Sequence, residues 1–208
     1  EAPGGGPRLS KRVVLATRNA GKIAELRRIL APYDVELVGL DEFPEVGEVA
    51  ETGTSFADNA LLKAREVCRT TGLVAIADDS GLTVEALNGL PGILSARWAG
   101  RHGDDSANLE LVLAQLADLP DDRRGAAFVC AAAAVSPGGA EVLAEERIDG
   151  VLLRSRRGSG GFGYDPIFLP VGQTQTTAEM SAERKDEISH RGKAFRALAP
   201  MLADLLSG

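Results

Sequence analysis

The chain is poor in the residues that build redox centres and transition-metal sites. Its 208 residues include two cysteines, Cys68 and Cys130, and two histidines. Both cysteines lie inside apolar stretches, they form no C-x-x-C pair, and no further His ligands are spaced to complete a zinc site. We therefore expect two small buried core residues in a reducing, cytoplasmic compartment rather than a metal or redox site.

Long apolar runs and an excess of positive charge are also missing. The longest apolar run, Ala126 to Val135, is too short for the roughly 20 residues that span a bilayer, so it predicts a buried strand and no membrane segment. The 23 Lys and Arg residues against 30 Asp and Glu give a net charge of −7 at pH 7. This balance argues against a general nucleic-acid binder, which needs a basic face, but it leaves room for one local cationic site that binds a polyanion.

What the sequence does contain is an alternation of short apolar runs with helical patterns, which is typical of an α/β protein with a mixed sheet. Strands are expected at 12–16, 35–40, 73–77, 125–135, 142–148 and 167–169. Helices are expected at 22–30, 55–71, 105–116 and from 189 onward, with loops at 41–53 and 88–104. We expect residues 1–10 to be a flexible N-terminal tail and residues 11–208 to form a single domain.

Two of the expected helices have apolar residues at helical spacing, which predicts their buried faces. In 105–116 the stripe consists of Ala107, Leu111 and Ala114. In the last helix it consists of Phe195, Leu198, Met201, Leu202 and Leu205, and we expect Pro200 to kink this helix.

The first cluster with chemical potential lies between the first strand and the first helix. It consists of Thr17, Arg18, Asn19, Ala20, Gly21 and Lys22. Backbone N–H groups at a helix N-terminus, together with a lysine and polar side chains, suit a phosphate group. The segment is not a Walker motif, and a capped surface turn is an equally good interpretation of these residues alone.

The second cluster lies on the helix expected at 55–71. Its core stripe is formed by Ala57, Ala60, Leu61, Ala64, Val67 and Cys68. Phe56, Asn59 and Lys63 follow one flank of that stripe, so Lys63 would be partly desolvated and directed across a cleft. The alternative for Lys63 is a surface lysine that lays its stem along the helix.

The third cluster is a pair of adjacent carboxylates, Asp78 and Asp79, expected in a turn directly after a buried strand. Two neighbouring carboxylates repel each other unless a cation lies nearby. Oxygen ligands of this kind suit Mg²⁺, and Glu51 in the preceding loop would add a further carboxylate. A solvated Asp-Asp turn is the alternative, and the sequence does not distinguish Asp78 from Asp79 as a catalytic base.

The fourth cluster is the glycine-rich loop that contains Phe162, Gly163, Tyr164 and Asp165. An aromatic ring between glycines can lie flat against a planar ligand, because no neighbouring side chain obstructs its face. A hairpin with structural aromatic residues explains the same pattern.

The fifth cluster opens the last helix with Ser189, His190 and Arg191, and Lys185 precedes it. Together these residues predict a cationic pole at a helix N-terminus, where basic residues are not favoured by the helix dipole. Arginine only donates hydrogen bonds, so Arg191 would pair with the carbonyl oxygen of a 6-oxo purine and not with the amine of adenine.

Taken together, these segments resemble the inosine triphosphate pyrophosphatase family, and the resemblance runs from about Val13 to the last helix. It rests on six motifs in the same order. They are Thr17-x-Asn19-x-x-Lys22, the Glu51 to Ala64 segment, Ala77-Asp-Asp-Ser-Gly81, Leu90-Pro-Gly-x-x-Ser-Ala-Arg97, Gly160-Gly-Phe-Gly-Tyr-Asp-Pro166 and Ser189-His-Arg191.

The resemblance implies a two-lobed α/β fold around a substrate cleft, a homodimer, Mg²⁺ as cofactor, and a purine nucleoside triphosphate as substrate. It implies that Asp79 and Lys63 are catalytic and that Glu51 and Asp79 hold the metal. The implied substrate-binding residues are Thr17, Arg18, Asn19, Ala20, Gly21, Lys22, Asn59, Ser80, Phe162, Gly163, Tyr164, Asp165, Lys185, His190 and Arg191. Among these, Phe162 would stack on the base, and Asp165, His190 and Arg191 would read its edge.

The activity that the resemblance implies is hydrolysis of non-canonical purine triphosphates such as ITP, dITP and XTP, giving a monophosphate and pyrophosphate. Water would attack the α-phosphorus in line, with Asp79 orienting or deprotonating it. Two alternatives are a pyrophosphatase for modified pyrimidine triphosphates and a nucleotide sensor without catalysis. The Ser189 to Arg191 segment disfavours the first, and the presence of Asp79 and Lys63 disfavours the second.

Overall fold

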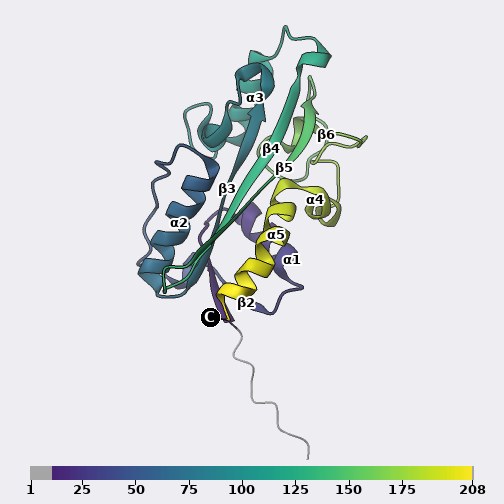
Figure 1. The fold of residues 1–208 in the computed structure, drawn as a ribbon. Helices are drawn as coiled ribbons and strands as arrows, with labels where there is room; N and C mark the ends of the chain where they lie inside the picture. Colours follow the sequence, from purple (N-terminus) through teal and green to yellow (C-terminus); the bar gives the residue numbers. More distant parts are fainter. Residues whose placement is uncertain (1–10, 208) are drawn as a thin grey trace, which may run out of the picture.

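A mixed six-stranded sheet runs through the part of the chain that the computed structural model describes, residues 11–207 (Figure 1). The strands are β1 (Lys11–Leu15), β2 (Val35–Val38), β3 (Val74–Val84), β4 (Gly125–Val135), β5 (Glu141–Leu152) and β6 (Phe168–Pro170). Their order is β2-β1-β3-β4-β5-β6; β1 pairs in parallel with β2 and β3, and the pairs from β3 to β6 are antiparallel. The predicted α/β class with a mixed sheet is confirmed, and the expected N-terminal tail lies outside the described residues.

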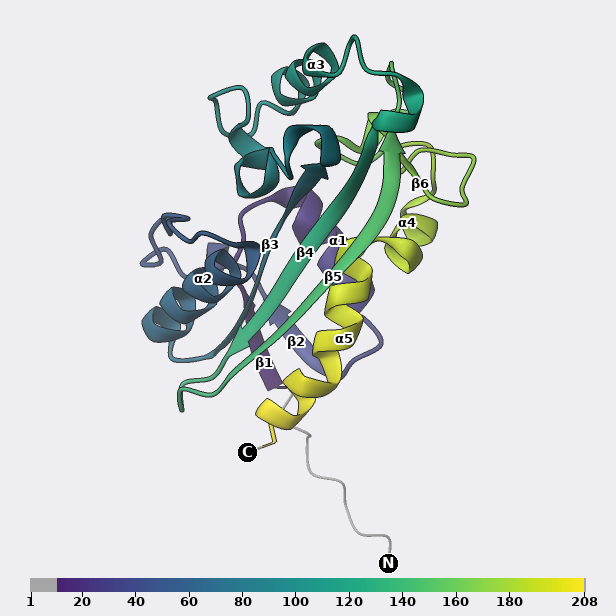
Figure 2. The same cartoon turned by 45° about the horizontal axis from the view of Figure 1, so that its top comes forward.

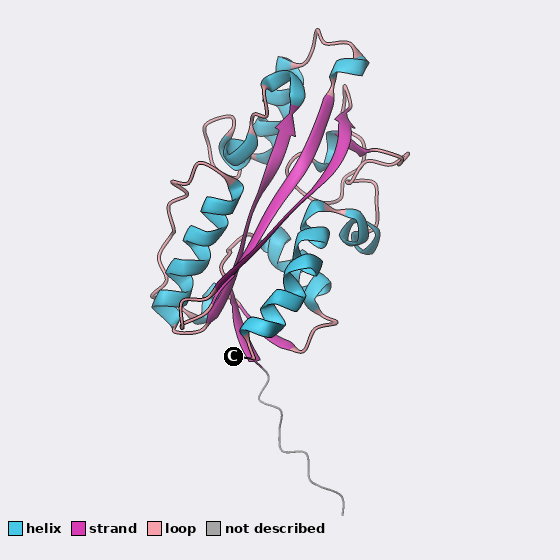
Figure 3. Cartoon of the chain, viewed as in Figure 1, coloured by secondary structure: helices cyan, strands magenta, loops and turns pink. Residues whose placement is uncertain are grey.

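Helices cover both faces of this sheet (Figures 1 and 2). On one face lies α2 (Phe56–Thr71), and on the other lie α1 (Ala20–Leu30) and α5 (His190–Leu205). The short helix α4 (Ala182–Ile188) packs beside α1 and α5. The helix α3 (Asp105–Gln115) lies at the far end of the long strands β3 to β5, away from α1, α2 and α5 (Figure 3).

The alanine-rich strand β4 explains how helices approach the sheet closely on both faces. Every residue from Ala126 to Val135 is buried, and Ala131 to Ala134 have no exposed surface. Alternate alanines belong to the core beneath α2 and to the core beneath α5. Because an alanine projects only a methyl group, the helix backbones lie near the sheet and carry polar side chains close to its strands.

Capping residues set the ends of α2, which carries two of the predicted site residues. The Ser55 hydroxyl accepts a hydrogen bond from the N–H of Asp58 at 3.1 Å, and the Asp58 carboxylate accepts one from the N–H of Thr54 at 3.2 Å. The helix ends at Gly72, whose φ of 68° is left-handed. A glycine adopts this conformation without the steric cost that a Cβ imposes, so the predicted bounds of the helix are nearly those observed.

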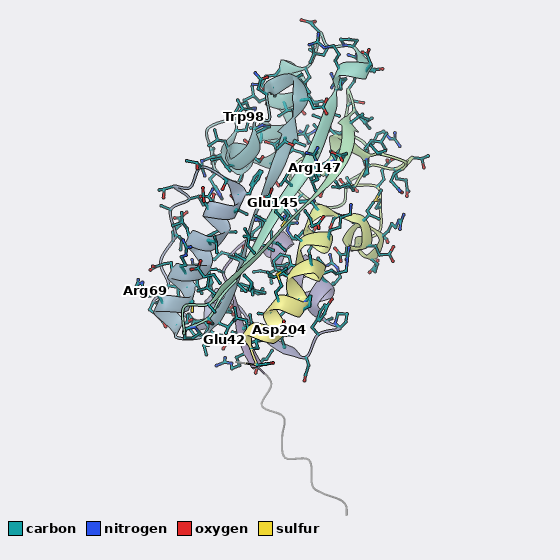
Figure 4. The ribbon with its side chains drawn as sticks, in the orientation of Figure 1. Glu42, Arg69, Trp98, Glu145, Arg147 and Asp204 are labelled. Carbon is teal, nitrogen blue, oxygen red and sulfur yellow. The ribbon has the colours of Figure 1, made fainter. Side chains whose placement is uncertain are left out.

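The strand β5 shows the plain alternation of a half-exposed strand. Its even-numbered residues Ala144, Ile148 and Leu152 are buried against the helices, whereas Glu145 and Arg147 lie on the exposed face (Figure 4). The strand is longer than the expected 142–148, because its hydrogen-bonded pairing with β4 continues through Gly150 and Val151.

The prediction that a strand ends at residue 77 and that Asp78 and Asp79 form a turn is wrong. The strand β3 continues to Val84, and Asp78 and Asp79 pair with Ala132 and Ala131 of β4. The run Asp78-Asp79-Ser80-Gly81 has the composition of a turn when the sequence is read locally. In the fold, pairing with a long neighbouring strand overrides that local preference.

The short helical segments of the structure were not predicted. The helix α4 was missed, and the expected loop at 88–104 contains a six-residue 3-10 helix, η3 (Gly92–Arg97). The second predicted strand ends at Val38 instead of Leu40, where another 3-10 turn begins. Segments this short carry too few periodic residues for a pattern to reveal them.

The predicted buried stripe of α3 is also wrong. The helix buries Asn108, Leu109 and Val112, whereas Ala114 is exposed. Asn108 is buried because its amide caps the segment next to η3: it accepts from the N–H of Ala99 at 2.7 Å and donates to the carbonyl of Ala96 at 3.1 Å. A polar residue with satisfied hydrogen bonds can occupy a core position, and a hydrophobic pattern cannot reveal this.

In α5 the prediction is right for Phe195, Leu198 and Leu202, which are buried, and wrong for Met201, which is exposed. The helix continues through Pro200 to Leu205. Within residues 11–207, no helix is both long and apolar enough to cross a membrane.

Phe195 tests the packing of α5 on the sheet. The Phe195→Ala substitution should lower the free energy of unfolding by roughly 3–5 kcal/mol, because the removed ring is fully buried and leaves a cavity. Met201→Ala on the same helix is the matched control and should cost less than about 1 kcal/mol, since Met201 is 40% exposed. Urea denaturation of both variants measures the difference; equal losses would contradict this packing.

Candidate functional site

One large cavity, with a volume of about 1140 Å³, brings together residues from most of the predicted site segments. It is lined by the loop before α1, the loop before α2, the middle of β3, η3, the start of α3, the glycine-rich loop, α4 and the start of α5. A volume of this order accommodates a nucleotide. The cavity is therefore where chemistry at the predicted residues would take place.

The segment before α1 has the geometry of an anion-binding turn. Asn19 is the N-cap, and its side chain accepts from the N–H of Lys22 at 3.1 Å, while the Thr17 hydroxyl accepts from the N–H of Asn19 at 3.2 Å. The first turn of α1 holds no acidic residue. The helix N-terminus therefore faces the cavity with partial positive charge that no side-chain carboxylate in that first turn offsets.

Arg18 in this segment points toward another loop. Its Nη2 donates to the carbonyl oxygen of Val46 at 2.7 Å, and Val46 is buried in the core beneath α2. The contact links the turn before α1 to the loop that carries Glu51.

The adjacent carboxylates of β3 lie on opposite faces of the sheet, because successive side chains of a strand alternate. Asp78 faces α1 and α5, where its Oδ2 lies 2.9 Å from Lys22 Nζ and 3.3 Å from Arg191 Nε. Asp79 faces α2, where its Oδ2 accepts from Asn59 Nδ2 at 3.0 Å. The repulsion expected between neighbours in a turn is thus reduced by the strand itself.

Asp78 is a buried structural anion. Burial by itself would raise the pKa of Asp78, but the charges of Lys22 and Arg191 outweigh it and hold the pKa far below its usual range. The Ser80 hydroxyl also donates to Oδ2 at 3.1 Å. Asp78 does not line the cavity, so its permanent charge serves to fix the cations around it.

Asp79 differs from Asp78 in two respects: it lines the cavity, and nearby positive charges offset the cost of its burial less completely. Burial and the nearby charge of Glu51 raise the pKa of Asp79, against the opposing effect of Lys63. Asn59 holds Oδ2 from behind, and the Asn59 carbonyl oxygen in turn accepts from the N–H of Gly53 at 2.8 Å. Two neighbouring carboxyls with oppositely shifted pKa values are a mark of a functional site.

Lys63 and Glu51 complete this wall of the cavity. Lys63 Nζ lies 2.8 Å from Glu51 Oε1 and 3.7 Å from Asp79 Oδ1. Burial opposes the charge of Lys63, but three carboxylates, Asp79 first, raise its pKa and keep it protonated. The prediction that Lys63 is partly desolvated and directed into a cleft is confirmed by its position.

The donor set on this wall fits a hard divalent cation that keeps other ligands. Glu51 and Asp79 offer carboxylate oxygens on either side of Lys63 Nζ. Asp79 is buried beside a second carboxylate, so a bound cation would stabilise its ionised form. Among residues 11–207 no group of three or more acidic, His or Cys side chains is arranged to hold a metal alone. A pair of carboxylates completed by phosphate oxygens and water is the arrangement that Mg²⁺ favours.

The opposite end of the cavity holds a buried ion network rather than the predicted cationic pole. Lys185 Nζ lies 2.7 Å from Glu25 Oε1 and 2.6 Å from Asp165 Oδ2. Arg191 pairs with Glu25 and with Asp78. The prediction of a cationic pole is therefore wrong, because the buried carboxylates of Glu25, Asp78 and Asp165 balance its charge.

Glu25 connects the two cations of this network and lies on α1, one turn after Lys22. Burial would raise the pKa of Glu25, but Arg191 and Lys185 lower it overall. Sequence reasoning missed Glu25. It falls on the buried stripe with Leu26 and Ile29, and a charged residue on an apolar stripe was the available signal.

The glycine-rich loop holds Phe162 beside this network. The Phe162 ring centroid lies 4.9 Å from Lys185 Nζ and 5.5 Å from Arg191 Cζ. The ring also lies against Gly21, where a Cβ would come within 2.7 Å of Phe162 Cδ1. Gly21 is thus needed for space, and the half-buried ring borders the cavity with cations nearby.

Hydrogen bonds fix the backbone of the same loop. The Asp165 carboxylate accepts from the N–H of Phe162 at 2.9 Å, and Asp105 of α3 accepts from the N–H of Gly163 at 2.8 Å. The Tyr164 hydroxyl donates to the Ser95 carbonyl at 2.8 Å, so Tyr164 also serves the core. The position of Phe162 is set in part by neighbours that are remote in sequence.

His190 lies buried against Phe128, with the two rings stacked at a centroid distance of 4.8 Å. Burial, with the charges of Arg191 and Lys185, lowers the pKa of His190 well below its usual value, so its imidazole is neutral near pH 7. Within the described residues its Nδ1 is buried without a hydrogen-bond partner.

All the predicted site residues except Ala20, Gly21 and Asn59 line this one cavity. Gly21 leaves space for the Phe162 ring, and Asn59 donates a hydrogen bond to Asp79. Besides Glu25, sequence reasoning assigned no role to Arg97, which lines the cavity and contacts Glu51.

Glu25 gives a test of the ion network. Glu25→Gln should lower the free energy of unfolding at pH 7 by roughly 3 kcal/mol, because the amide keeps the shape and removes the charge that Lys185 and Arg191 share. The folded-state pKa of Glu25 is lowered, so the unmodified chain has its full excess in free energy of unfolding over the variant at pH values above 4.5, the ordinary pKa of a glutamate. This excess disappears as the pH falls through the lower folded-state pKa.

Urea denaturation of both proteins at pH 7 and at successively lower pH measures this effect. Glu66→Gln is the control: it removes an exposed carboxylate on α2 that pairs with Arg69, and stability should hardly change. A Glu25→Gln variant as stable as the unmodified chain at pH 7 would show that the network contributes nothing.

Comparison with known proteins relates this site to a family. The model of the Ham1 family matches residues 13–201. A relative from Streptomyces coelicolor named dITP/XTP pyrophosphatase is 60% identical over 199 residues, covering 94% of this chain and 98% of the relative.

Solved structures agree with the sequence relatives. A nucleoside-triphosphatase / dITP/XTP pyrophosphatase from Mycobacterium abscessus is 58% identical with a TM-score of 0.74, covering 91% of this chain and 99% of that one. A HAM1 protein from Coxiella burnetii is 38% identical with a TM-score of 0.84, covering 93% and 99%. The motifs, the fold and these matches together show that the chain belongs to the Ham1 family.

Proposed function

We propose that the chain is a pyrophosphatase of non-canonical purine nucleoside triphosphates, with ITP, dITP and XTP as substrates and a monophosphate and pyrophosphate as products. The observation that carries the proposal is the different placement of two neighbours on β3: Asp78 pairs with Lys22 and Arg191 away from the cavity, whereas Asp79 lines the cavity beside Lys63 and has a raised pKa. The names of the relatives from S. coelicolor and M. abscessus support the same substrate class.

The triphosphate would bind at the N-terminus of α1 and along Lys22 and Lys63. The backbone N–H groups of Ala20 and Gly21 and the two lysines would neutralise charge on the phosphate oxygens. This electrostatic contribution is the largest single factor in most phosphoryl transfers. Thr17 and Arg18, which border the same turn, would fix the register of the phosphate chain.

Asp79 would orient and deprotonate the water that attacks the α-phosphorus in line. A raised pKa makes the carboxylate of Asp79 a better proton acceptor. Asn59 donates to Oδ2 and the N–H of Ser80 donates to Oδ1 at 3.0 Å, so the carboxylate is held in a fixed orientation beside the cavity that it lines. Attack at the α-phosphorus breaks the bond to the bridging oxygen, and pyrophosphate leaves with the electron pair.

Glu51 and Asp79 would hold the divalent ion, for which we propose Mg²⁺. When bound, this ion supplies positive charge to the phosphate oxygens. The protein contributes the position of the two carboxylates, which Lys63 and Asn59 fix.

The base would lie near Phe162, with its edge toward Asp165, His190 and Arg191. Arg191 already donates from Nε to Asp78, from Nη1 to Glu25 and from Nη2 to Ser80. These bonds hold the guanidinium rigidly as a donor, and a rigid donor rejects the exocyclic amine of adenine.

We propose, as the family resemblance implies, that the protein acts as a two-lobed homodimer in the cytoplasm, without nucleic-acid or membrane partners. Analytical ultracentrifugation of the purified chain tests the dimer directly.

Asp79→Asn should leave the protein folded and lower kcat by roughly 10²–10⁴-fold, because the amide keeps the hydrogen bond to Asn59 but cannot accept a proton. The control Asp118→Asn removes an exposed carboxylate that does not line the cavity and should have full activity. Steady-state release of pyrophosphate measures both, and normal turnover by Asp79→Asn would refute the assigned base.

Lys63→Ala should lower kcat by roughly 10²–10³-fold, as loss of one preorganised charge does elsewhere. Arg69→Ala, at an exposed position further along the same helix, is the control. If Lys63→Ala turned over at the rate of the control, Lys63 would have only a structural role.

The experiment that tests the function is pyrophosphate release from ITP, XTP, dITP, GTP, ATP and UTP, each with Mg²⁺ and with EDTA. We expect metal-dependent cleavage of ITP and XTP at least about a hundredfold faster than of ATP and GTP, or ~3 kcal/mol of discrimination. Preference for UTP would keep the chemistry and overturn the base assignment. Binding of nucleotides without any cleavage would indicate a sensor.

A further inference from the structure

Arg97 lines the same cavity as Lys63 but comes from a different element, the last position of η3. That helix is fixed to β3: the Ser95 hydroxyl accepts from the N–H of Leu82 at 2.9 Å and donates to the Gly92 carbonyl at 2.6 Å. At Gly81 a Cβ would collide with this junction. Arg97 is therefore carried by a rigid support that is joined to the strand of Asp79.

Glu51 is shared between two cations of the cavity. Its Oε1 lies 2.8 Å from Lys63 Nζ, and its Oε2 lies 3.4 Å from Arg97 Nη1. The second contact is long for a charge-assisted hydrogen bond, and the Arg97 side chain is 34% exposed. Burial by itself would raise the pKa of Glu51, but Lys63 and, more weakly, Arg97 lower it.

The other cations of the cavity that pair with carboxylates are held more firmly. Lys22 lies 2.9 Å from Asp78, Lys185 lies 2.6 Å from Asp165, and Arg191 is buried between two carboxylates. Within residues 11–207, the guanidinium of Arg97 donates a hydrogen bond to Glu51 through one of its five N–H groups. It is thus the arginine that can leave its carboxylate at least cost.

We propose that Arg97 binds the terminal phosphates of the substrate, and that it pairs with Glu51 while no substrate is bound. This inference rests on the function proposed above and adds a phosphate-binding residue to it. A divalent ion held by Glu51 would repel the nearby guanidinium and weaken its 3.4 Å contact with Oε2, which would free Arg97 for other anions. The planar fork of Arg97 then pairs with phosphate oxygens of the pyrophosphate group.

The position of Arg97 identifies which part of the substrate it meets. It shares Glu51 with Lys63, which would bind the triphosphate, whereas Arg191, which would read the base, pairs with Glu25 and Asp78. Arg97 therefore meets the phosphate chain and not the base, and a monophosphate would not engage it.

Isothermal titration calorimetry of the full chain tests the proposal with three probes: Mg²⁺ alone, inorganic pyrophosphate with saturating Mg²⁺, and IMP with saturating Mg²⁺. In Arg97→Ala we expect pyrophosphate to bind about tenfold more weakly or worse, since a charge-assisted hydrogen bond is lost. Mg²⁺ alone should bind more tightly, because its competitor for Glu51 is gone, and IMP binding should not change.

Arg101→Ala is the matched control, because Arg101 is exposed on the same connection and does not line the cavity. It should bind all three probes like the unmodified chain. Arg97→Gln, which keeps most of the side-chain length, must follow Arg97→Ala if charge and not packing is the cause. Melting temperatures of all variants check that each one folds.

Unchanged pyrophosphate affinity in both Arg97 variants would overturn the proposal, and so would an unmodified chain that binds no pyrophosphate. Weaker Mg²⁺ binding in these variants would also overturn it, because Arg97 would then support Glu51 instead of competing for it. None of these titrations requires turnover, so failure of the proposed hydrolysis would be seen separately in the pyrophosphate-release assay.

Discussion

The alternation of side chains along β3 is the constraint on which the rest of the site depends. Because Asp78 and Asp79 are neighbours in a strand with helices on both faces, they meet different partners: the cations of α1 and α5 on one side, and α2 with Lys63 on the other. Two successive sheet positions thus provide a permanent structural anion and, beside it, a carboxylate with a raised pKa. The alanines of β4 bring the helices near enough for both sets of contacts.

The buried anions have a further consequence for binding. Asp78 and Glu25 neutralise the lysines and the arginine that would otherwise repel one another in a cavity that binds a polyanion. Such a network fixes its side chains before a ligand arrives, which lowers the ordering cost of binding. The loosely paired cation Arg97 lies near Glu51.

Much of this architecture could be predicted from the sequence, because its signals are local. The helix from Ser55 has a capping residue at one end and a glycine at the other, and the turn from Thr17 to Lys22 has the composition of a helix start. The course of β3 through Asp78 could not be predicted, because only its pairing with β4 keeps it extended. Glu25 and Arg97 were missed for a similar reason: their partners are remote in sequence.

In the proposed mechanism, water directed by Asp79 attacks the α-phosphorus of a purine triphosphate. Hydrolysis of ITP in ¹⁸O-labelled water, followed by mass spectrometry of both products, tests this step most directly. The mechanism predicts that the label enters the inosine monophosphate and that the pyrophosphate stays unlabelled. Label in the pyrophosphate would mean attack at the β-phosphorus, and it would contradict the proposed role of Asp79.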